Sequence, residues 1–149
     1  MQSDITIEID APIEVVFDAA CHHVAEWSTV VKEDEVLHET PEVVGSTFRV
    51  VTEDRGRKME FEGVVTIHEQ PTRSGATMAG KSFDIEVDYT LEDLGGKTRL
   101  RQVTACHGKG FAKLIFFVMK PFMGKAACDA NNKELAGLKA FAEKRAAGE

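Results

Sequence analysis

Apolar and polar residues alternate strictly near the start of the chain, where positions 5–10 read ITIEID. A period of two is typical of a strand that buries one face. We expect this strand to end at Ala11-Pro12, because proline suits the first turn of a helix and apolar residues then recur at helical spacing over 15–20. A second short helix, followed by a loop with the only tryptophan, Trp27, is expected over 21–31.

Strand-like segments separated by short turns fill the middle of the chain. The expected strands are 47–52, 58–67, 76–81, 83–91 and 97–106, with a weaker one at 35–39. Connections such as Asp54-Arg55-Gly56 and Leu94-Gly95-Gly96 are too short to hold a crossover helix. The strands are therefore predicted to pair with their sequence neighbours as an antiparallel meander.

The last third of the chain has the pattern of one long helix. A stripe at spacings of three and four runs from Leu114 through Phe117 and Asn131 to Leu135 and beyond, and Pro121 is expected to kink the helix or to mark where its regular part begins. The predicted fold is α+β. It is a curved antiparallel sheet of about six to seven strands around a long C-terminal helix, with two short helices after the first strand.

The predicted turns fix which residues face each other across the sheet. The Gly95-Gly96 turn pairs Leu91 with Leu100, Tyr89 with Gln102, Val87 with Thr104 and Ile85 with Cys106 on one face. The Arg55-Gly56 turn pairs Val50 with Phe61 and Thr52 with Met59, and places Phe48, Gly63, Val65 and Ile67 on the same side. Both hairpins thus present a mostly apolar inner face to the helix.

Several polar side chains interrupt this inner face. They are Thr52, Tyr89, Gln102 and Thr104 on the strands and Asn131 on the helix. One interpretation is a closed core in which these groups satisfy one another or bind water. The other is a ligand cavity with a few orienting hydrogen bonds, which the clustering on facing elements favours. The candidate ligand-binding residues are Trp27, Phe48, Val50, Met59, Phe61, Met78, Ile85, Val87, Tyr89, Gln102, Thr104, Phe117 and Asn131.

The composition of the chain restricts the classes of function that it can have. A chain of 149 residues with 43% hydrophobic content is expected to form one domain over 1–149 without metal or disulfide support. A net charge of −7 disfavours a nucleic-acid partner. Three cysteines far apart, and an acidic start with no leader pattern, lead us to expect a cytoplasmic location.

No motif for metal, nucleotide or serine-hydrolase chemistry is present in the sequence, so no cofactor is expected. The best single candidate for a general base is His107, at the end of the last strand and near the expected pocket mouth, and it is a weak candidate. Cys106 is expected to be a buried, inert thiol. Whether the chain is an enzyme stays open, with a binder favoured.

Several segments resemble the SRPBCC superfamily, the START-like helix-grip proteins, and within it the polyketide cyclase/dehydrase and lipid-transport group. They are ITIEIDAPIEVVF at 5–17, Trp27 in the following loop, GSTF at 45–48, YTLE at 89–92 and ELAGLK at 134–139. The resemblance implies a pocket between the long helix and the sheet. It also implies a ligand among lipids, sterols, polyketides, hormones or quinones, with some members catalytic and many only carriers. A fold with so many activities does not name one.

The block 111–123 is apolar on every side but lies on a helix that covers only one side of a sheet. Its outer face needs a cover: the Trp27 loop as a lid, a second subunit in a homodimer, or transient contact with a membrane. Because it contains Lys113, Lys120 and Pro121 and is too short for a span, we expect no stable membrane insertion.

The sequence therefore favours a binder or carrier of an apolar or amphipathic small molecule. Two alternatives stay open. One is a polyketide cyclase or dehydratase-like enzyme that uses the same pocket, with His107 or Tyr89 moving protons. The other is a protein-interaction or stress-response module that uses the apolar block 111–123.

Overall fold

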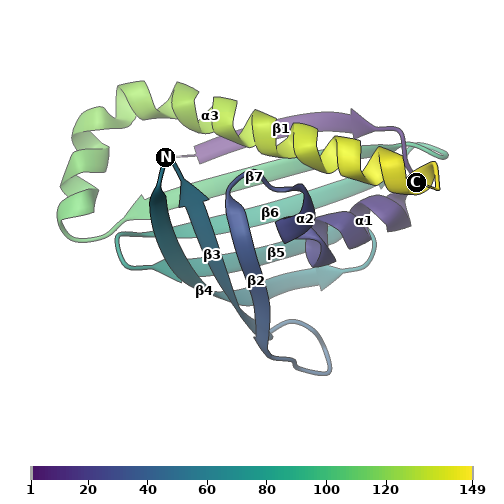
Figure 1. Cartoon of the computed structure of the whole chain (residues 1–149), viewed down its shortest axis with the longest axis horizontal. Helices are drawn as coiled ribbons and strands as arrows, with labels where there is room; N and C mark the ends of the chain where they lie inside the picture. Colours follow the sequence, from purple (N-terminus) through teal and green to yellow (C-terminus); the bar gives the residue numbers. More distant parts are fainter. Residues whose placement is uncertain (1, 149) are drawn as a thin grey trace.

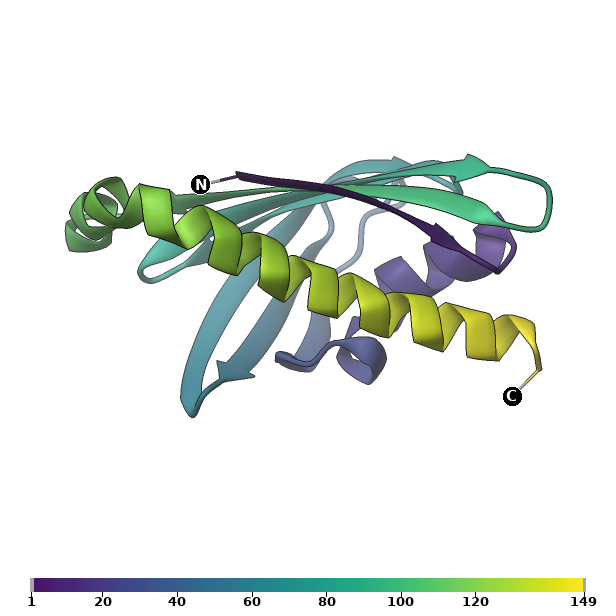
Figure 2. The ribbon, with the colours of Figure 1, turned by 90° about the horizontal axis from the view of Figure 1, so that it is seen from above.

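The computed structural model describes residues 2–148, without the side chains of residues 112, 116 and 119–127. The strands are β1 (Gln2–Ile9), β2 (Val31–His38), β3 (Thr47–Asp54), β4 (Arg57–Glu69), β5 (Arg73–Gly80), β6 (Phe83–Asp93) and β7 (Thr98–Gly108), and the helices are α1 (Ile13–His22), α2 (Val24–Trp27) and α3 (Phe111–Ala146). The seven strands form one antiparallel sheet in the order β1-β7-β6-β5-β4-β3-β2. The sheet curves around α3, as Figures 1 and 2 show, which confirms the predicted fold.

The strand registers deduced from the two turns are confirmed. Tyr89 lies opposite Gln102 and Val87 opposite Thr104 in β6 and β7. Val50 faces Phe61 in β3 and β4. A turn between two apolar strands leaves few alternative registers, because a slip of one residue would turn every apolar side chain to the other face.

Two strands begin several residues earlier than predicted. β2 begins at Val31 instead of 35 and pairs with β3 through two register shifts. β5 begins at Arg73 instead of 76, because Ser74 pairs with His68 and continues the ladder with β4 into a segment whose residues favour turns. Pairing across the sheet overrides local preference here.

A register shift in β4 corrects the predicted position of Ile67. The shift lies between Val65, which pairs with Ala76, and Ile67, which pairs with Gly75. One extra residue reverses the facing of the residues that follow it. Ile67 is therefore on the outer face, and His68 is on the inner face, where its ring contacts that of Phe17 in α1.

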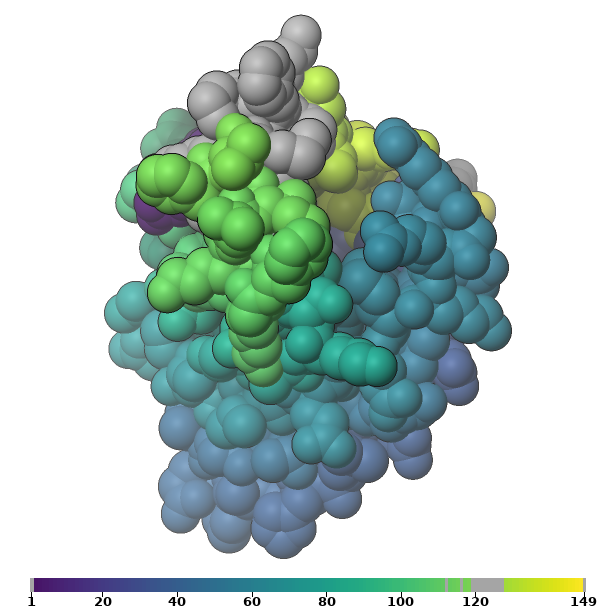
Figure 3. All heavy atoms as spheres, turned by 90° about the vertical axis from the view of Figure 1, so that its left-hand side faces the viewer, coloured from purple at the N-terminus to yellow at the C-terminus, as the bar shows by residue number. Residues whose placement is uncertain are grey.

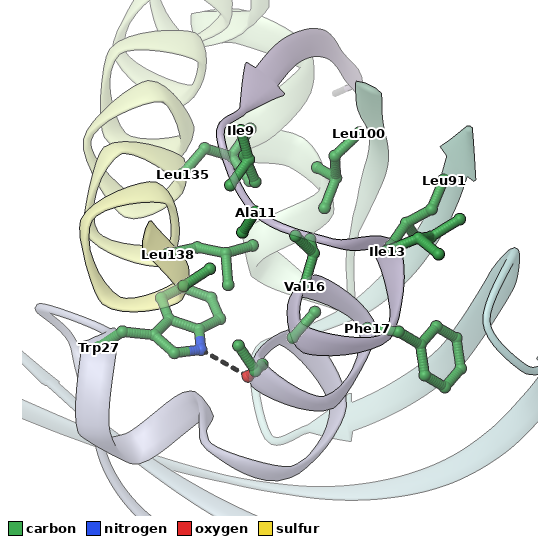
Figure 4. Close-up of a cluster of buried hydrophobic side chains, with 13 residues drawn as sticks. Ile9, Ala11, Ile13, Val16, Phe17, Trp27, Leu91, Leu100, Leu135 and Leu138 are labelled. Carbon is green, nitrogen blue, oxygen red and sulfur yellow. Dashed lines mark hydrogen bonds between the residues drawn. The ribbon is translucent and has the colours of Figure 1, made fainter. Parts of the chain in front are cut away.

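The main core lies under the C-terminal half of α3. Leu135 and Leu138 are fully buried against β1 and α1, as Figure 4 shows. Trp27 belongs to this core: its side chain is 8% exposed and its Nε1 donates to the carbonyl oxygen of Ala19 at 2.8 Å. It is not a lid over the apolar block, which corrects that expectation.

Polar contacts fasten the same half of α3 at two places. The carboxylate of Glu134 accepts hydrogen bonds from the hydroxyls of Ser28 and Thr29 and, at 2.9 Å, from the Thr29 backbone N–H. Nearer the C-terminus, Glu143 accepts the backbone N–H of Asp10 at 2.8 Å. The helix is thus tied to the residues that follow α2 and to the end of β1.

The first turns of α3 point in a different direction from the rest of the helix and stand at one end of the sheet (Figure 1). Phe117, predicted to contact the ligand, is 80% exposed, and Phe111 is 76% exposed. The proposed kink at Pro121 falls among residues whose side chains lie outside the described part of the chain. Within that part, no helix is long and apolar enough to cross a membrane.

At Gly137, α3 lies close to the end of α2. A methyl group at this position would lie 2.6 Å from the carbonyl oxygen of Trp27, which is backbone and cannot rotate away. We expect Gly137→Ala to lower the free energy of unfolding by about 1 to 3 kcal/mol, although the same change at an open helix site raises it by up to ~1 kcal/mol. Urea denaturation provides the measurement.

Ala136, which is exposed, supplies the matched control for helix propensity. Ala136→Gly should cost only about 1 kcal/mol. If Gly137→Ala stabilised the protein, the close packing of α3 on the Trp27 carbonyl would be disproved.

Candidate ligand cavity

A cavity of about 150 Å³ lies between the sheet and α3. β1 contributes its first residues, β6 and β7 contribute their inner faces, and α3 contributes Ala130 and Asn131. The cavity is partly open to solvent, because Gln2 and Ala130 at its rim are exposed. The lining residues are Gln2, Ser3, Ile85, Thr104, Cys106, Ala130 and Asn131. None of these side chains carries a charge at neutral pH, and the wall is mainly apolar.

Buried polar atoms without a partner lie in and beside this cavity. Within the described part of the chain, Thr104 Oγ1 and Gln102 Oε1 are shielded from solvent and have no hydrogen-bond partner, and the same holds for Thr52 Oγ1 on β3. Each such atom costs roughly 1 to 3 kcal/mol if nothing binds it. Gln102 and Thr104 both lie on β7, so two unpartnered polar atoms follow one another along the inner face of this strand.

Tyr89 and Gln102 form a hydrogen-bonded pair across β6 and β7. The Gln102 Nε2 donates to the Tyr89 Oη at 3.0 Å. Because the phenol oxygen accepts this bond, its own proton is available for donation, and the amide oxygen of Gln102 is available to accept. Burial raises the pKa of Tyr89 to about 12, so the phenol is neutral at physiological pH.

Burial also affects the pKa of the thiols near the inner face. It raises the pKa of Cys106, which lines the cavity, and that of Cys21, on α1. A thiol with a raised pKa is a poor nucleophile, because the reactive form is the thiolate. In the described part of the chain, no three His, Cys, Asp or Glu side chains gather as a metal site requires.

His107 does not lie at the cavity mouth. It pairs with Asp84 on the face opposite to Cys106, and its Nε2 lies 3.7 Å from the carboxylate of Glu86. Its side chain is 60% exposed. The alternation of β7 places the imidazole on the outer face of the sheet, so the expected position of this candidate base is corrected.

The structure brings together only some of the predicted ligand-binding residues. Ile85, Thr104 and Asn131 line the cavity. Val87, Tyr89 and Gln102 share the inner face of β6 and β7 with them. The others are not among its lining residues: Phe48, Val50, Met59, Phe61 and Met78 lie on the inner face of β3, β4 and β5, Trp27 is in the core, and Phe117 is exposed.

Gln2, Ser3 and Ala130 line the cavity but were not predicted. The sequence did indicate the position of Ser3. It lies on the same face of β1 as Ile5 and Ile7, and it pairs with Thr104. Ser3 is 4% exposed, so the inner face of β1 ends in a buried hydroxyl. Ala130 lies beside Asn131 on α3, where a small residue leaves room.

A curved antiparallel sheet that closes on a long C-terminal helix, with a cavity between them, is the architecture of a helix-grip domain. The family described as "Polyketide cyclase / dehydrase and lipid transport" matches residues 2–143, and the chain belongs to this family. The resemblance to the SRPBCC superfamily is thereby confirmed. No curated protein matches the sequence.

Solved structures share the fold at low sequence identity. A protein from Thermus thermophilus, TTHA0849, is 16% identical with a TM-score of 0.79, covering 95% of this chain and 97% of its own. The Zhui aromatase/cyclase from Streptomyces sp. R1128 is 12% identical with a TM-score of 0.75, covering 97% and 94%. A START superfamily protein from Mycobacterium smegmatis is 18% identical with a TM-score of 0.74, covering 99% and 97%.

The only tyrosine in the chain gives a direct test of the buried pair. We expect absorbance at the tyrosinate band to rise with a midpoint near pH 12 in the folded protein, where burial holds the pKa of Tyr89 at about 12, and near pH ~10 in urea. Because the folded state keeps its proton longer, stability is complete below pH ~10 and falls as the pH rises towards 12, by roughly 2 to 3 kcal/mol.

Tyr89→Phe separates this contribution from that of the thiols, whose raised pKa values act in the same direction. The variant should lose the absorbance change and show a shallower fall of stability between pH 10 and 12. A native midpoint near pH ~10 would contradict the burial of the phenol.

Proposed function

We propose that the chain binds a neutral, largely apolar small molecule with a hydroxyl or carbonyl group, in the cavity between the sheet and α3. The observation that carries this proposal is a buried, unpartnered hydroxyl oxygen, Thr104 Oγ1, on a residue that lines an otherwise apolar cavity. A second unpartnered atom, Gln102 Oε1, lies one row further along the same strand. Water or a ligand group supplies their missing hydrogen bonds. Family membership supports the same class of function.

The size of the cavity limits the part of the ligand that it holds. An apolar cavity of about 150 Å³ accommodates one benzene-sized ring. A larger ligand, such as a polyketide or a sterol, would place one ring in this cavity and extend along the inner face of the sheet. Tyr89 and Gln102, one row further along the sheet, are positioned to meet such an extension.

The chemistry of the lining favours a neutral ligand. A buried carboxylate or ammonium group is stable only beside a compensating charge, and none of the lining side chains provides one. The free phenol proton of Tyr89 and the amide oxygen of Gln102 form a donor beside an acceptor. A hydroxyl group satisfies both, because it donates and accepts.

Binding is favoured over catalysis by the protonation states at the site. General acid–base catalysis works best with a pKa near the operating pH, whereas burial raises the pKa of Tyr89 to about 12 and raises that of Cys106. The rival proposal is a cyclase or dehydratase-like enzyme, in line with the name of the Zhui aromatase/cyclase. It requires the Tyr89 phenol to act as an acid on a bound substrate.

A pair of similar ring compounds tests the binding proposal. p-Cresol and p-xylene have nearly the same shape and differ by one hydroxyl, so we expect p-cresol to bind more tightly by about the value of one hydrogen bond, roughly 2- to 12-fold. Thr104→Val should remove this preference without preventing the binding of p-xylene, because it deletes an unpartnered hydroxyl of the lining and keeps the shape of the side chain. Heteronuclear NMR titration, followed at Thr104 and Asn131, measures both dissociation constants.

Thr104→Leu should fill the cavity and abolish the binding of both compounds. Thr90→Leu makes the same change at an exposed position on β6 and should leave both affinities unchanged. The proposal fails if neither compound shifts the resonances of Thr104 and Asn131, since the cavity would then be part of a closed core.

A further inference from the structure

Two turns of the sheet and the start of α3 lie at one end of the molecule. β3, β5 and β7 run in the same direction, because each is antiparallel to the strands beside it, so the β3–β4 turn, the β5–β6 turn and the start of α3 share that end. The last two are in contact, since the Lys109 backbone N–H donates to the carbonyl oxygen of Ser82 at 2.9 Å. We call residues 54–58, 80–82 and 109–118 the basic end (Figure 1).

The charge of the basic end is opposite to that of the rest of the chain. Its six basic side chains are all exposed, and its one acidic side chain is Asp54, which gives a formal net charge of +5. Lys109 is paired at 2.7 Å with the carboxylate of Asp84, which lies just outside these residues, so the other five basic side chains carry most of the attraction for an anion. The chain as a whole carries −7, so the remaining residues carry −12. The basic residues are Arg55, Arg57, Lys58, Lys81, Lys109 and Lys113.

Large apolar side chains lie beside these charges on the first turns of α3. Phe117 is 80% exposed, Phe111 76%, Val118 66% and Leu114 57%. Figure 3 views this end directly and shows the first turns of α3, in green, projecting from it beside a recess bordered by the blue to teal strands. An exposed group of this kind marks an interaction surface.

We propose that the basic end docks on the surface of an anionic phospholipid membrane. Exposed Phe and Leu side chains flanked by lysines are the features of a helix that lies in a membrane interface, and clustered basic residues are attracted to anionic headgroups. The same turns carry both features here. Docking is at the surface, since no helix in the described part of the chain can span a membrane.

The charges disfavour a second copy of the chain as the occupant. Joining two basic ends would bring +5 against +5 at the moment when the apolar side chains are being desolvated. A membrane with anionic lipids supplies the complementary charge and a medium for the apolar side chains together. The inference goes beyond the proposed binding function and does not depend on a ligand in the cavity.

Vesicle flotation tests the proposal with the intact chain. We expect binding to vesicles of phosphatidylcholine with one-quarter phosphatidylglycerol, little binding to phosphatidylcholine alone, and a loss of binding at high salt. The double variant Lys81→Gln/Lys113→Gln should weaken binding by roughly 30-fold, because each lysine contributes about fivefold near an anionic surface. Phe117→Asp should abolish detectable binding.

Lys97→Gln provides the matched control, since Lys97 is an exposed lysine in the β6–β7 turn at the opposite end of the sheet. It should bind as the unaltered chain does. Urea denaturation midpoints verify that all variants fold, which is expected because the altered side chains are exposed.

Equal binding to neutral and anionic vesicles, no binding to either, or unchanged binding by Phe117→Asp would each overturn the proposal. Sedimentation velocity tests whether the surface instead joins two copies of the chain. If the unaltered chain is a dimer that Phe117→Asp dissociates, and vesicles do not bind, the surface joins two copies of the chain and not a membrane.

Discussion

The close packing of α3 against the chain after α2 is the constraint on which the rest of the structure depends. Gly137 lets the helix backbone approach the Trp27 carbonyl, and Glu134 ties the helix to Ser28 and Thr29 by hydrogen bonds. Since the curved sheet is continuous from β1 to β2, fixing this half of the helix also fixes how far its other half stands from β6 and β7. The cavity occupies the space between this other half of α3 and the two strands.

The change along α3 from core to cavity follows from its sequence. Leu135 and Leu138 fill the space beneath the helix completely. One turn earlier, Asn131 and Ala130 replace large apolar residues, and the cavity begins there. Two turns or more further back, described side chains such as Phe117 are exposed. A single helix therefore passes from buried core, through a cavity wall, to an exposed apolar surface.

The sequence predicts most of the fold because the turns are short and the apolar alternation is strong. The pairing of Tyr89 with Gln102 and of Val50 with Phe61 followed from turn position alone. The shift in β4 could not be predicted in this way, because an extra residue within a strand leaves no mark in composition. The shift places Ile67 on the outer face of the sheet and His68 on the inner face, the reverse of a regular strand.

The site was less predictable than the fold for a physical reason. Alternation tells which face a side chain occupies, but a cavity depends on the distance between two elements, which packing elsewhere determines. Asn131, Thr104 and Ile85 line the cavity, whereas Trp27, which the sequence places in a loop, is buried in the core. His107 lies near the end of β7, as predicted, but it follows Cys106 directly, so the alternation of the strand turns its side chain to the outer face.

The order of the sheet has a consequence for self-association. Because the order begins with β1 and ends with β2, the sheet does not close, and β2 is an edge strand with exposed residues over most of its length. Unpaired edges invite strand addition from other molecules and hence aggregation. Residues 32–35 read KEDE, so a strand added to this edge would have to approach three carboxylates. These charges therefore protect the open edge of the sheet against strand addition.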